Sequence, residues 1–249
     1  MKIRAVIDAK DRLAVRAIAG NRDHYQPLEF DGQCCDPVTA AKRMMDRFGV
    51  RDFYLADLDA ISGQVADWES IHQVATVADS LWFDIGIGSV QRLEVVASQL
   101  QSLPPTSVAI FGLESLTDIQ VLEAAISSLG PEQICFSLDL RNGKPVTGIP
   151  QWREVPPAQI ALQVIELGFR KLILLDLAAV GTESGCPTLR LSETIRRQIR
   201  SLLPATEQLE IVTGGGIRNV DDIQQLENAK VDQALVATAL EQVTLSSHE

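Results

Sequence analysis

The chain has 249 residues, a length typical of one α/β barrel, and its 46% of hydrophobic residues can build a large core. The formal net charge of −11 excludes the basic surface that a nucleic-acid partner requires, but small phosphates remain open because backbone N–H groups can bind them. No apolar run approaches the roughly 20 residues of a membrane span, and Asp8 comes too early for a signal peptide. The four cysteines lack metal or disulfide spacing, so we expect a cytoplasmic protein with no membrane partner, metal or cofactor.

Eight short apolar runs predict strands that are buried on both faces. They are rich in Val, Ile, Leu and Phe and do not alternate with polar residues. In chain order, they occupy residues 3–7, 53–56, 81–83, 108–111, 134–138, 172–175, 211–213 and 234–237.

Helical patterns lie between these runs. Asp36 and Pro37 form an N-cap and first-turn pair, and the helix that they begin is expected to stop near Gly49. Further helices are predicted near residues 67–78, 89–100, 117–129, 157–167, 192–203 and 220–229. Regular alternation of strand and helix predicts a parallel sheet.

Four strand ends recur in the same order about half a chain length apart. Asp8 matches Asp139, "LADLDAISG" matches "LLDLAAVGT", "DIGIGSV" matches "GGGIRNV", and residues 108–115 match 234–241. This pattern predicts a single (βα)8 TIM barrel over residues 1–249, built from half-barrel repeats at about 1–130 and 131–245.

Asp8 and Asp139 each follow a buried run, at strands one and five of the predicted barrel. In such a barrel the catalytic groups lie at the carboxyl ends of the strands, so these two carboxylates would face each other across one cavity. The alternative is that each aspartate caps a turn or pairs with a nearby cation.

Glycine-rich strand ends suggest phosphate sites. Gly214, Gly215 and Gly216 follow the seventh strand and precede a helix, where backbone N–H groups and the helix dipole favour an anion. The matching set would form a second site, although tight turns also use glycine; it comprises Gly86, Gly88, Gly112 and Ser115.

These motifs resemble those of the HisA/HisF family of histidine biosynthesis over nearly the whole chain. The most distinctive stretches are "VIDAKDRLAVR" and "SLDLRNGKPVTG", supported by "FYLADLDAISG", "VGTESGCP" and "IVTGGGIRNVDDI". The resemblance implies half-barrel-repeat enzymes that act on a small substrate with a phosphate at each end. The HisA members perform an aldose–ketose (Amadori) isomerisation, and the HisF members are cyclase-lyases.

The resemblance also implies roles for individual residues. Asp8 and Asp139 would be the general acid and base, and such paired carboxylates suit ring opening followed by proton removal. Arg16 would contact the substrate, and Trp152 would be a mobile aromatic side chain over it, with a surface salt bridge and simple packing as the respective alternatives.

Several positions depart from the family pattern. The family usually has a Thr and an acid/base Asp around the sixth strand, where this chain has Leu175 and Val180, so the neighbouring Asp176 is a candidate replacement. Strand eight ends at Ala237 and Thr238 where a glycine is usual, which leaves the threonine hydroxyl as a phosphate donor.

Two further departures concern larger segments. Strand three reads "DIGIG" where a longer glycine run is expected. The last helix is expected to be short or missing. A homo-oligomer in which a second subunit covers this flank of the barrel therefore stays an open alternative. Such departures resemble those of divergent HisA-like paralogues found beside pterin-type one-carbon cofactor genes.

Three functions therefore stay open. The first is an Amadori-type isomerase of a phosphorylated sugar conjugate, as in histidine biosynthesis. The second is a paralogue that acts on another phosphorylated metabolite. The third is a catalytically idle phosphosugar-binding subunit.

Overall fold

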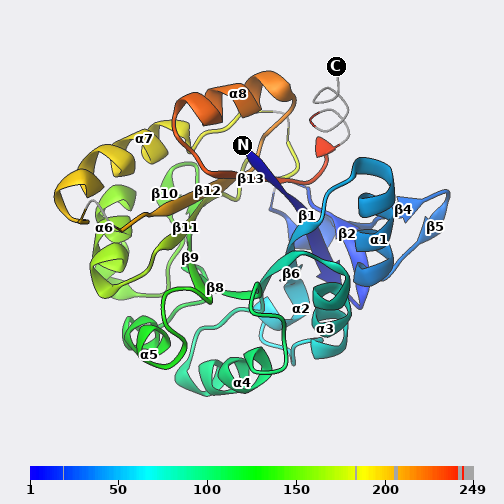
Figure 1. The fold of residues 1–249 in the computed structure, drawn as a ribbon, viewed down its shortest axis with the longest axis horizontal. Coiled ribbons are helices and arrows are strands. Elements are labelled where there is room, and N and C mark those ends of the chain that lie inside the picture. Colours follow the sequence, from blue (N-terminus) through cyan, green and yellow to red (C-terminus); the bar gives the residue numbers. More distant parts are fainter. Residues whose placement is uncertain (19, 183, 205–206, 241–242, 244–249) are drawn as a thin grey trace.

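The computed structural model describes residues 1–18, 20–182, 184–204, 207–240 and 243. Within these residues, eight parallel strands close into a barrel (Figure 1). The first and last strands pair in parallel, from Lys2 opposite Gln233 to Ala5 opposite Val236. The predicted (βα)8 barrel is therefore confirmed, and every predicted strand overlaps an observed one. The barrel strands are β1 (Lys2–Lys10), β6 (Asp52–Asp57), β7 (Ser80–Asp84), β8 (Val108–Gly112), β9 (Ile134–Arg141), β11 (Lys171–Asp176), β12 (Glu210–Gly214) and β13 (Gln233–Val236).

Helices surround the barrel (Figure 1). As predicted, Asp36 caps the first of them by accepting a hydrogen bond from the Thr39 N–H at 2.7 Å, and Gly49 ends it with a φ of 68°. The outer helices are α1 (Pro37–Phe48), α3 (Trp68–Val77), α4 (Val90–Leu100), α5 (Gln120–Leu129), α6 (Pro157–Leu167), α7 (Leu189–Gln198) and α8 (Val220–Asn228).

Two helices start away from their predicted positions. Helix α5 begins later than residue 117, because Thr117 lies in the preceding loop and donates from Oγ1 to the Gly88 carbonyl at 3.1 Å. Helix α7 begins earlier than residue 192, directly after the buried Thr188. The prediction of a short or missing last helix falls on residues 241–242 and 244–249, which lie outside the described part of the chain.

Short elements that were not predicted decorate the loops. They are the helix α2 (Leu58–Ile61), the 3-10 turns η1 (Arg22–His24), η2 (Pro150–Trp152) and η3 (Ile199–Ser201), and the strands β2 (Leu13–Arg16), β3 (Gln26–Pro27), β4 (Glu29–Phe30), β5 (Gln33–Cys34) and β10 (Lys144–Pro145).

Two of these short strands explain the charged turns after Asp8 and Asp139. Strand β1 folds back onto β2 through Asp11 and Arg12, whose φ angles are 51° and 62°. Strand β9 folds back onto β10 through Asn142 and Gly143, whose φ angles are 52° and 76°. Two consecutive residues with positive φ are typical of tight hairpin turns, so strands one and five carry matching hairpins beyond the barrel rim.

Both faces of the barrel sheet are buried. In β6, Phe53 and Leu55 pack outward under the helices, whereas Tyr54 and Ala56 belong to a separate cluster inside the barrel. The inner cluster also contains the buried thiol of Cys135, and burial raises its pKa well above the usual value. Burial on both faces is the reason that the strands read as continuous apolar runs.

Arg4 fills the barrel at the amino-terminal ends of its strands. Its side chain is 1% exposed, and its guanidinium lies 4.4 Å from the centre of the Trp82 ring. Nε donates to Gln233 Oε1 at 3.2 Å, and Nη1 donates to the Phe53 carbonyl at 3.0 Å. Burial lowers the pKa of Arg4 to about 10, against the opposing effect of Asp52. The guanidinium thus ties together strands from both ends of the chain.

Replacing Arg4 tests this role. We expect Arg4→Met to lower the free energy of unfolding by about 3 kcal/mol, because the polar groups around the guanidinium lose their partner in a dry interior. Urea titration would measure this loss. The control is Arg12→Met, which removes a 69% exposed side chain paired with Asp67 and Glu69 and should lower stability much less than Arg4→Met does. Equal effects for the two variants would contradict a structural role for Arg4.

Candidate active site

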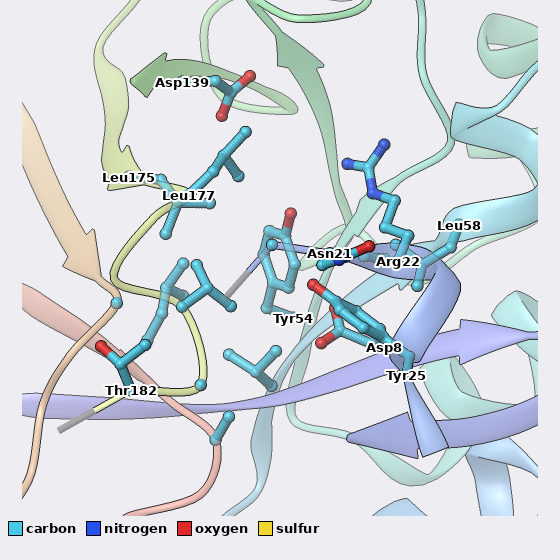
Figure 2. Close-up of a pocket in the computed structure, with 18 of the residues that line it drawn as sticks. Asp8, Asn21, Arg22, Tyr25, Tyr54, Leu58, Asp139, Leu175, Leu177 and Thr182 are labelled. Carbon is cyan, nitrogen blue, oxygen red and sulfur yellow. The ribbon is translucent and has the colours of Figure 1, made fainter. Parts of the chain in front are cut away.

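A cavity of about 330 Å³ lies at the carboxyl ends of the barrel strands (Figure 2). Asp8 and Asp139 both line it, from β1 and β9, which are four strands apart in the ring of eight and therefore opposite each other. Figure 2 shows the two carboxylates well separated, with the ring of Tyr54 between them in this view. The predicted arrangement of the two aspartates is therefore observed, whereas their chemical roles stay a prediction.

Asp8 lies at the point where β1 meets both β6 and β2. No hydrogen bond to its carboxylate occurs within the described residues. Burial raises its pKa to about 7, and the positive charge of Arg22 opposes this shift. Asp8 in turn helps to raise the pKa of Tyr25, chiefly a burial effect, to about 12. A carboxyl group with a pKa near neutrality can both accept and release a proton at physiological pH.

Asp139 is more deeply buried, with 4% of its side chain exposed. Ser137 Oγ donates to its Oδ1 at 2.6 Å, and the Glu114 N–H donates to its Oδ2 at 3.2 Å. Burial raises its pKa well above the usual value, and the negative charges of Glu114 and Asp84 add to the shift. Asp139 is consequently the more strongly protonated of the two opposing aspartates.

Asp84 is a site residue that the sequence analysis missed. It ends β7, is 5% exposed and lines the same cavity. Burial raises its pKa to about 7, although a hydrogen bond from the Gly86 N–H opposes the shift. A side chain on Gly112 would meet both carboxylates, because its Cβ would lie 3.1 Å from Asp139 Oδ2 and 3.3 Å from Asp84 Oδ2. Gly112 therefore gives two acids room in one place.

The signal for Asp84 was present in the sequence. It follows an apolar run just as Asp8 and Asp139 do, but its match with Gly214 in the repeat led to the prediction of a glycine loop there. Arg22 and Glu114 were also missed. They lie in loops distant in sequence and form an ion pair in the cavity wall. No local sequence pattern predicts such a pair.

The predicted phosphate loop after β12 borders the opposite part of the cavity. Gly215 and Gly216 line it with φ angles of 83° and 79°, together with Ala237 and Thr238 after β13. Gly214 does not line the cavity. Its missing side chain leaves room for Leu235 of the neighbouring strand, because a Cβ on Gly214 would lie only 2.8 Å from the Leu235 Cβ.

Asp176 lies outside this cavity. Its Oδ1 accepts from the Asn142 N–H at 3.0 Å and its Oδ2 from the Gly143 N–H at 2.8 Å, so it holds the β9–β10 hairpin turn. Strand alternation directs it away from the barrel interior, whereas its neighbour Leu175 lines the cavity. The candidate replacement for the missing acid thus caps a turn outside the cavity.

Trp152 is also remote from the cavity. It is 2% exposed, packs edge-on against Phe136 and donates from Nε1 to Gln163 Oε1 at 2.7 Å. The expected mobile aromatic side chain over the substrate is therefore a core residue in this structure. The simple-packing alternative describes it.

The remaining predicted residues lie at the edge of the site. Arg16 lines an adjoining hollow of about 210 Å³ that shares Asp8, Ala237 and Thr238 with the main cavity. Gly86, Gly88 and Ser115 lie outside the cavity lining, and they pack against one another instead. A Cβ on Gly88 would lie 2.1 Å from the Ser115 carbonyl oxygen. In the described part of the chain, no cluster of His, Cys, Asp and Glu is arranged to hold a metal ion.

Sequence comparison identifies relatives of this chain. A protein of Methanocaldococcus jannaschii described as uncharacterized is 31% identical over 100% of this chain and 97% of its own. The enzyme 1-(5-phosphoribosyl)-5-((5-phosphoribosylamino)methylideneamino)imidazole-4-carboxamide isomerase is 28% identical in one strain of Thermus thermophilus, over 96% of this chain and 94% of its own. The isomerase of the same name from Bacillus anthracis is 24% identical over 100% of this chain and 97% of its own.

None of the described helices is long and apolar enough to span a membrane. The sequence model of the family described as "Histidine biosynthesis protein" matches residues 2–246. Because that match covers nearly the whole sequence, the chain belongs to the histidine biosynthesis protein family.

Proposed function

We propose that the protein is an aldose–ketose isomerase of the Amadori type that acts on a phosphorylated sugar conjugate. The observation that carries this proposal is the pair of carboxyl groups, Asp8 and Asp139, that face one cavity from opposite strands with raised pKa values. The names of the curated isomerases support the same reaction class.

The two aspartates suit the two proton transfers of this reaction. Ring opening needs a proton delivered to the ring oxygen, and formation of the enolamine needs a proton removed from the neighbouring carbon. Asp139, buried and flanked by Glu114 and Asp84, stays protonated and suits the general acid. Asp8, with a pKa of about 7, suits the general base.

The loops after β12 and β13 suit the phosphate group. In the described residues, the N–H groups of Gly216, Ile217 and Thr238 have no hydrogen-bond partner. Backbone N–H groups that face a cavity in this way bind anions without a basic side chain. The net charge of −11 is therefore compatible with a phosphorylated substrate.

A second candidate keeps the barrel and the reaction class but changes the substrate. Leu175 and Val180 line the cavity with apolar side chains at the positions where the family resemblance expects a threonine and an acid. A substrate other than the aminoaldose of histidine biosynthesis, as in a divergent paralogue, fits this surface. A catalytically idle subunit has less support, because buried carboxyl groups with raised pKa values lower stability without a return in function.

Substitution of the paired aspartates tests the acid–base roles. With the histidine-pathway aminoaldose as probe, we expect Asp8→Asn and Asp139→Asn each to lower kcat about 100-fold or more, because a proton transfer loses its catalyst. The wild-type kcat should rise through about pH 7 as Asp8 ionises. Asp176→Asn is the control and should keep most of the activity, since Asp176 caps a turn outside the cavity.

The outcomes separate the candidates. Wild-type turnover of that aminoaldose supports the first candidate, and a folded protein that binds phosphate but leaves this substrate unchanged rejects it in favour of the second. Full activity of Asp8→Asn would contradict the assignment of the base.

The pH dependence of stability gives a test that needs no substrate. In the folded protein the pKa of Asp84 is raised from 3.8 to about 7, so the folded state holds a proton that the unfolded state has lost. Stability therefore falls as the pH rises from about 4 to about 7 and is then constant. At 1.36 kcal/mol per pH unit, the shift corresponds to at most about 4 kcal/mol.

We accordingly expect Asp84→Asn to raise the free energy of unfolding by about 2–4 kcal/mol at pH 8, and by about 1 kcal/mol at pH 4.5. The amide oxygen can still accept the hydrogen bond from the Gly86 N–H. Urea titrations at the two pH values would measure the difference. Asp176→Asn, whose carboxylate is satisfied by backbone N–H groups, should lower stability instead. A destabilised Asp84→Asn protein at pH 8 would contradict the prediction.

A further inference from the structure

The cavity is bordered by two loops that match in sequence but differ in chemistry. Residues 84–88 of the first half match residues 214–218 of the second, so Asp84 occupies the place of Gly214 and Ile85 that of Gly215. A substrate with a phosphate at each end would need both loops to accept an anion. The two loops differ in whether their N–H groups are free to bind one.

The loop after β12 is open to an anion. Gly216 and Ile217 keep their N–H groups free of partners within the described residues, as do Thr238 and Ala239 after β13. Gly215, Gly216, Ile217 and Thr238 all line the cavity. One phosphate is therefore accommodated at this end.

The matching loop after β7 already contains its own anions. The Gly86 N–H, equivalent to that of Gly216, donates to Asp84 Oδ1 at 2.9 Å. In the loop after β8, the Glu114 N–H donates to Asp139 Oδ2 at 3.2 Å. The donors that a second phosphate would use are consequently occupied by two carboxyl groups of the chain, and the charge of ionised Asp84 repels a phosphate.

Two oxygen atoms at this end have no hydrogen-bond partner within the described residues. Asp84 Oδ2 has no hydrogen bond within the described part of the chain, and the Tyr54 hydroxyl, on a side chain that is 7% exposed, has none either. The Tyr54 hydroxyl points into the cavity (Figure 2). A buried polar group that is aimed into a cavity and has no protein partner is satisfied by a ligand or by water.

The charged side chains at the cavity wall are mostly acidic. Arg22 is already paired with Glu114, so that cation is balanced within the protein. The cavity wall carries five carboxyl groups and two guanidinium groups, namely Asp8, Asp23, Asp84, Glu114 and Asp139 against Arg22 and Arg141.

We propose that the cavity binds a monophosphate whose far end carries an amine or another cationic hydrogen-bond donor, held by Asp84, in place of a second phosphate. This proposal rests on the second candidate of the proposed function, because it assumes the same phosphate loop and the same cavity but a substrate with one phosphate. Asp84 is then a specificity-determining residue, which replaces an anion site with a cation site.

Matched synthetic probes test the proposal. At each of a series of chain lengths, isothermal titration calorimetry would compare an ω-aminoalkyl phosphate, the corresponding alkyl phosphate and the corresponding alkanediol bisphosphate, with inorganic phosphate as the probe of the loop alone. At the best length, we expect the aminoalkyl phosphate to bind about tenfold more tightly than either of the others.

Variants of Asp84 test whether this residue causes the tighter binding of the aminoalkyl phosphate. Asp84→Asn should remove the advantage of the amine but leave the binding of alkyl phosphate unchanged. Asp84→Gly, which restores the glycine of the matching loop, should increase the affinity for the bisphosphate about tenfold. Asp176→Asn, an acid outside the cavity, should leave the order of the three probes as in the wild type.

Failure of this inference and failure of the proposed function would give different binding results. Tightest binding of the bisphosphate by the wild-type protein, or equal binding of amine and alkyl probes, would overturn this inference and leave the phosphate loop of the proposed function in place. Failure of every probe and of inorganic phosphate to bind a folded protein would remove the phosphate loop, and the proposed function with it.

Discussion

Parallel pairing between β1 and β13 closes the sheet, and the properties of the site depend on this closure. A closed barrel directs the carboxyl ends of all of its strands to one rim, so residues separated by half the chain length come to face one cavity. Asp8 and Asp139 meet in this way from opposite strands. The closure also removes the cavity from bulk water, and burial is the first cause of the raised pKa values of Asp8, Asp84 and Asp139.

Electrostatics then divides the cavity into two unlike ends. Within the described residues, the backbone N–H groups of Gly216 and Thr238 have no partner and offer partial positive charge, whereas the carboxyl groups of Asp84 and Asp139 gather near β7 and β9. Gly112 permits this concentration, because any side chain there would contact both carboxylates. A molecule bound in this cavity is therefore oriented by its own charge distribution.

Much of the fold was predictable from the sequence, because strands buried on both faces leave unbroken apolar runs and helices leave caps such as Asp36 and Gly49. The rim positions of Asp8 and Asp139 were predictable for the same reason, since each ends such a run. The strand-end rule identified Asp176 as well, but the parity of a strand decides whether its last side chain points inward, and Leu175 rather than Asp176 points inward here.

Other features of the site depend on contacts that no local pattern encodes. The burial of Trp152 against Phe136 and the pairing of Arg22 with Glu114 join residues that are distant in sequence. Asp84 was missed because residues 84–90 match 214–220 in the repeat, and this match places Asp84 at the position of the uncharged Gly214. Repeats therefore predict where a loop lies more reliably than they predict what it binds.

The filled amino-terminal end of the barrel has a kinetic consequence. Arg4 and Trp82 occupy the interior there, so a molecule in the cavity has the rim side as its route to solvent. In the proposed isomerisation, reactant and product have the same atoms and would use that one passage in turn. Each release would then precede the next capture, and the rate at which the rim loops release the proposed phosphate would set an upper bound on turnover.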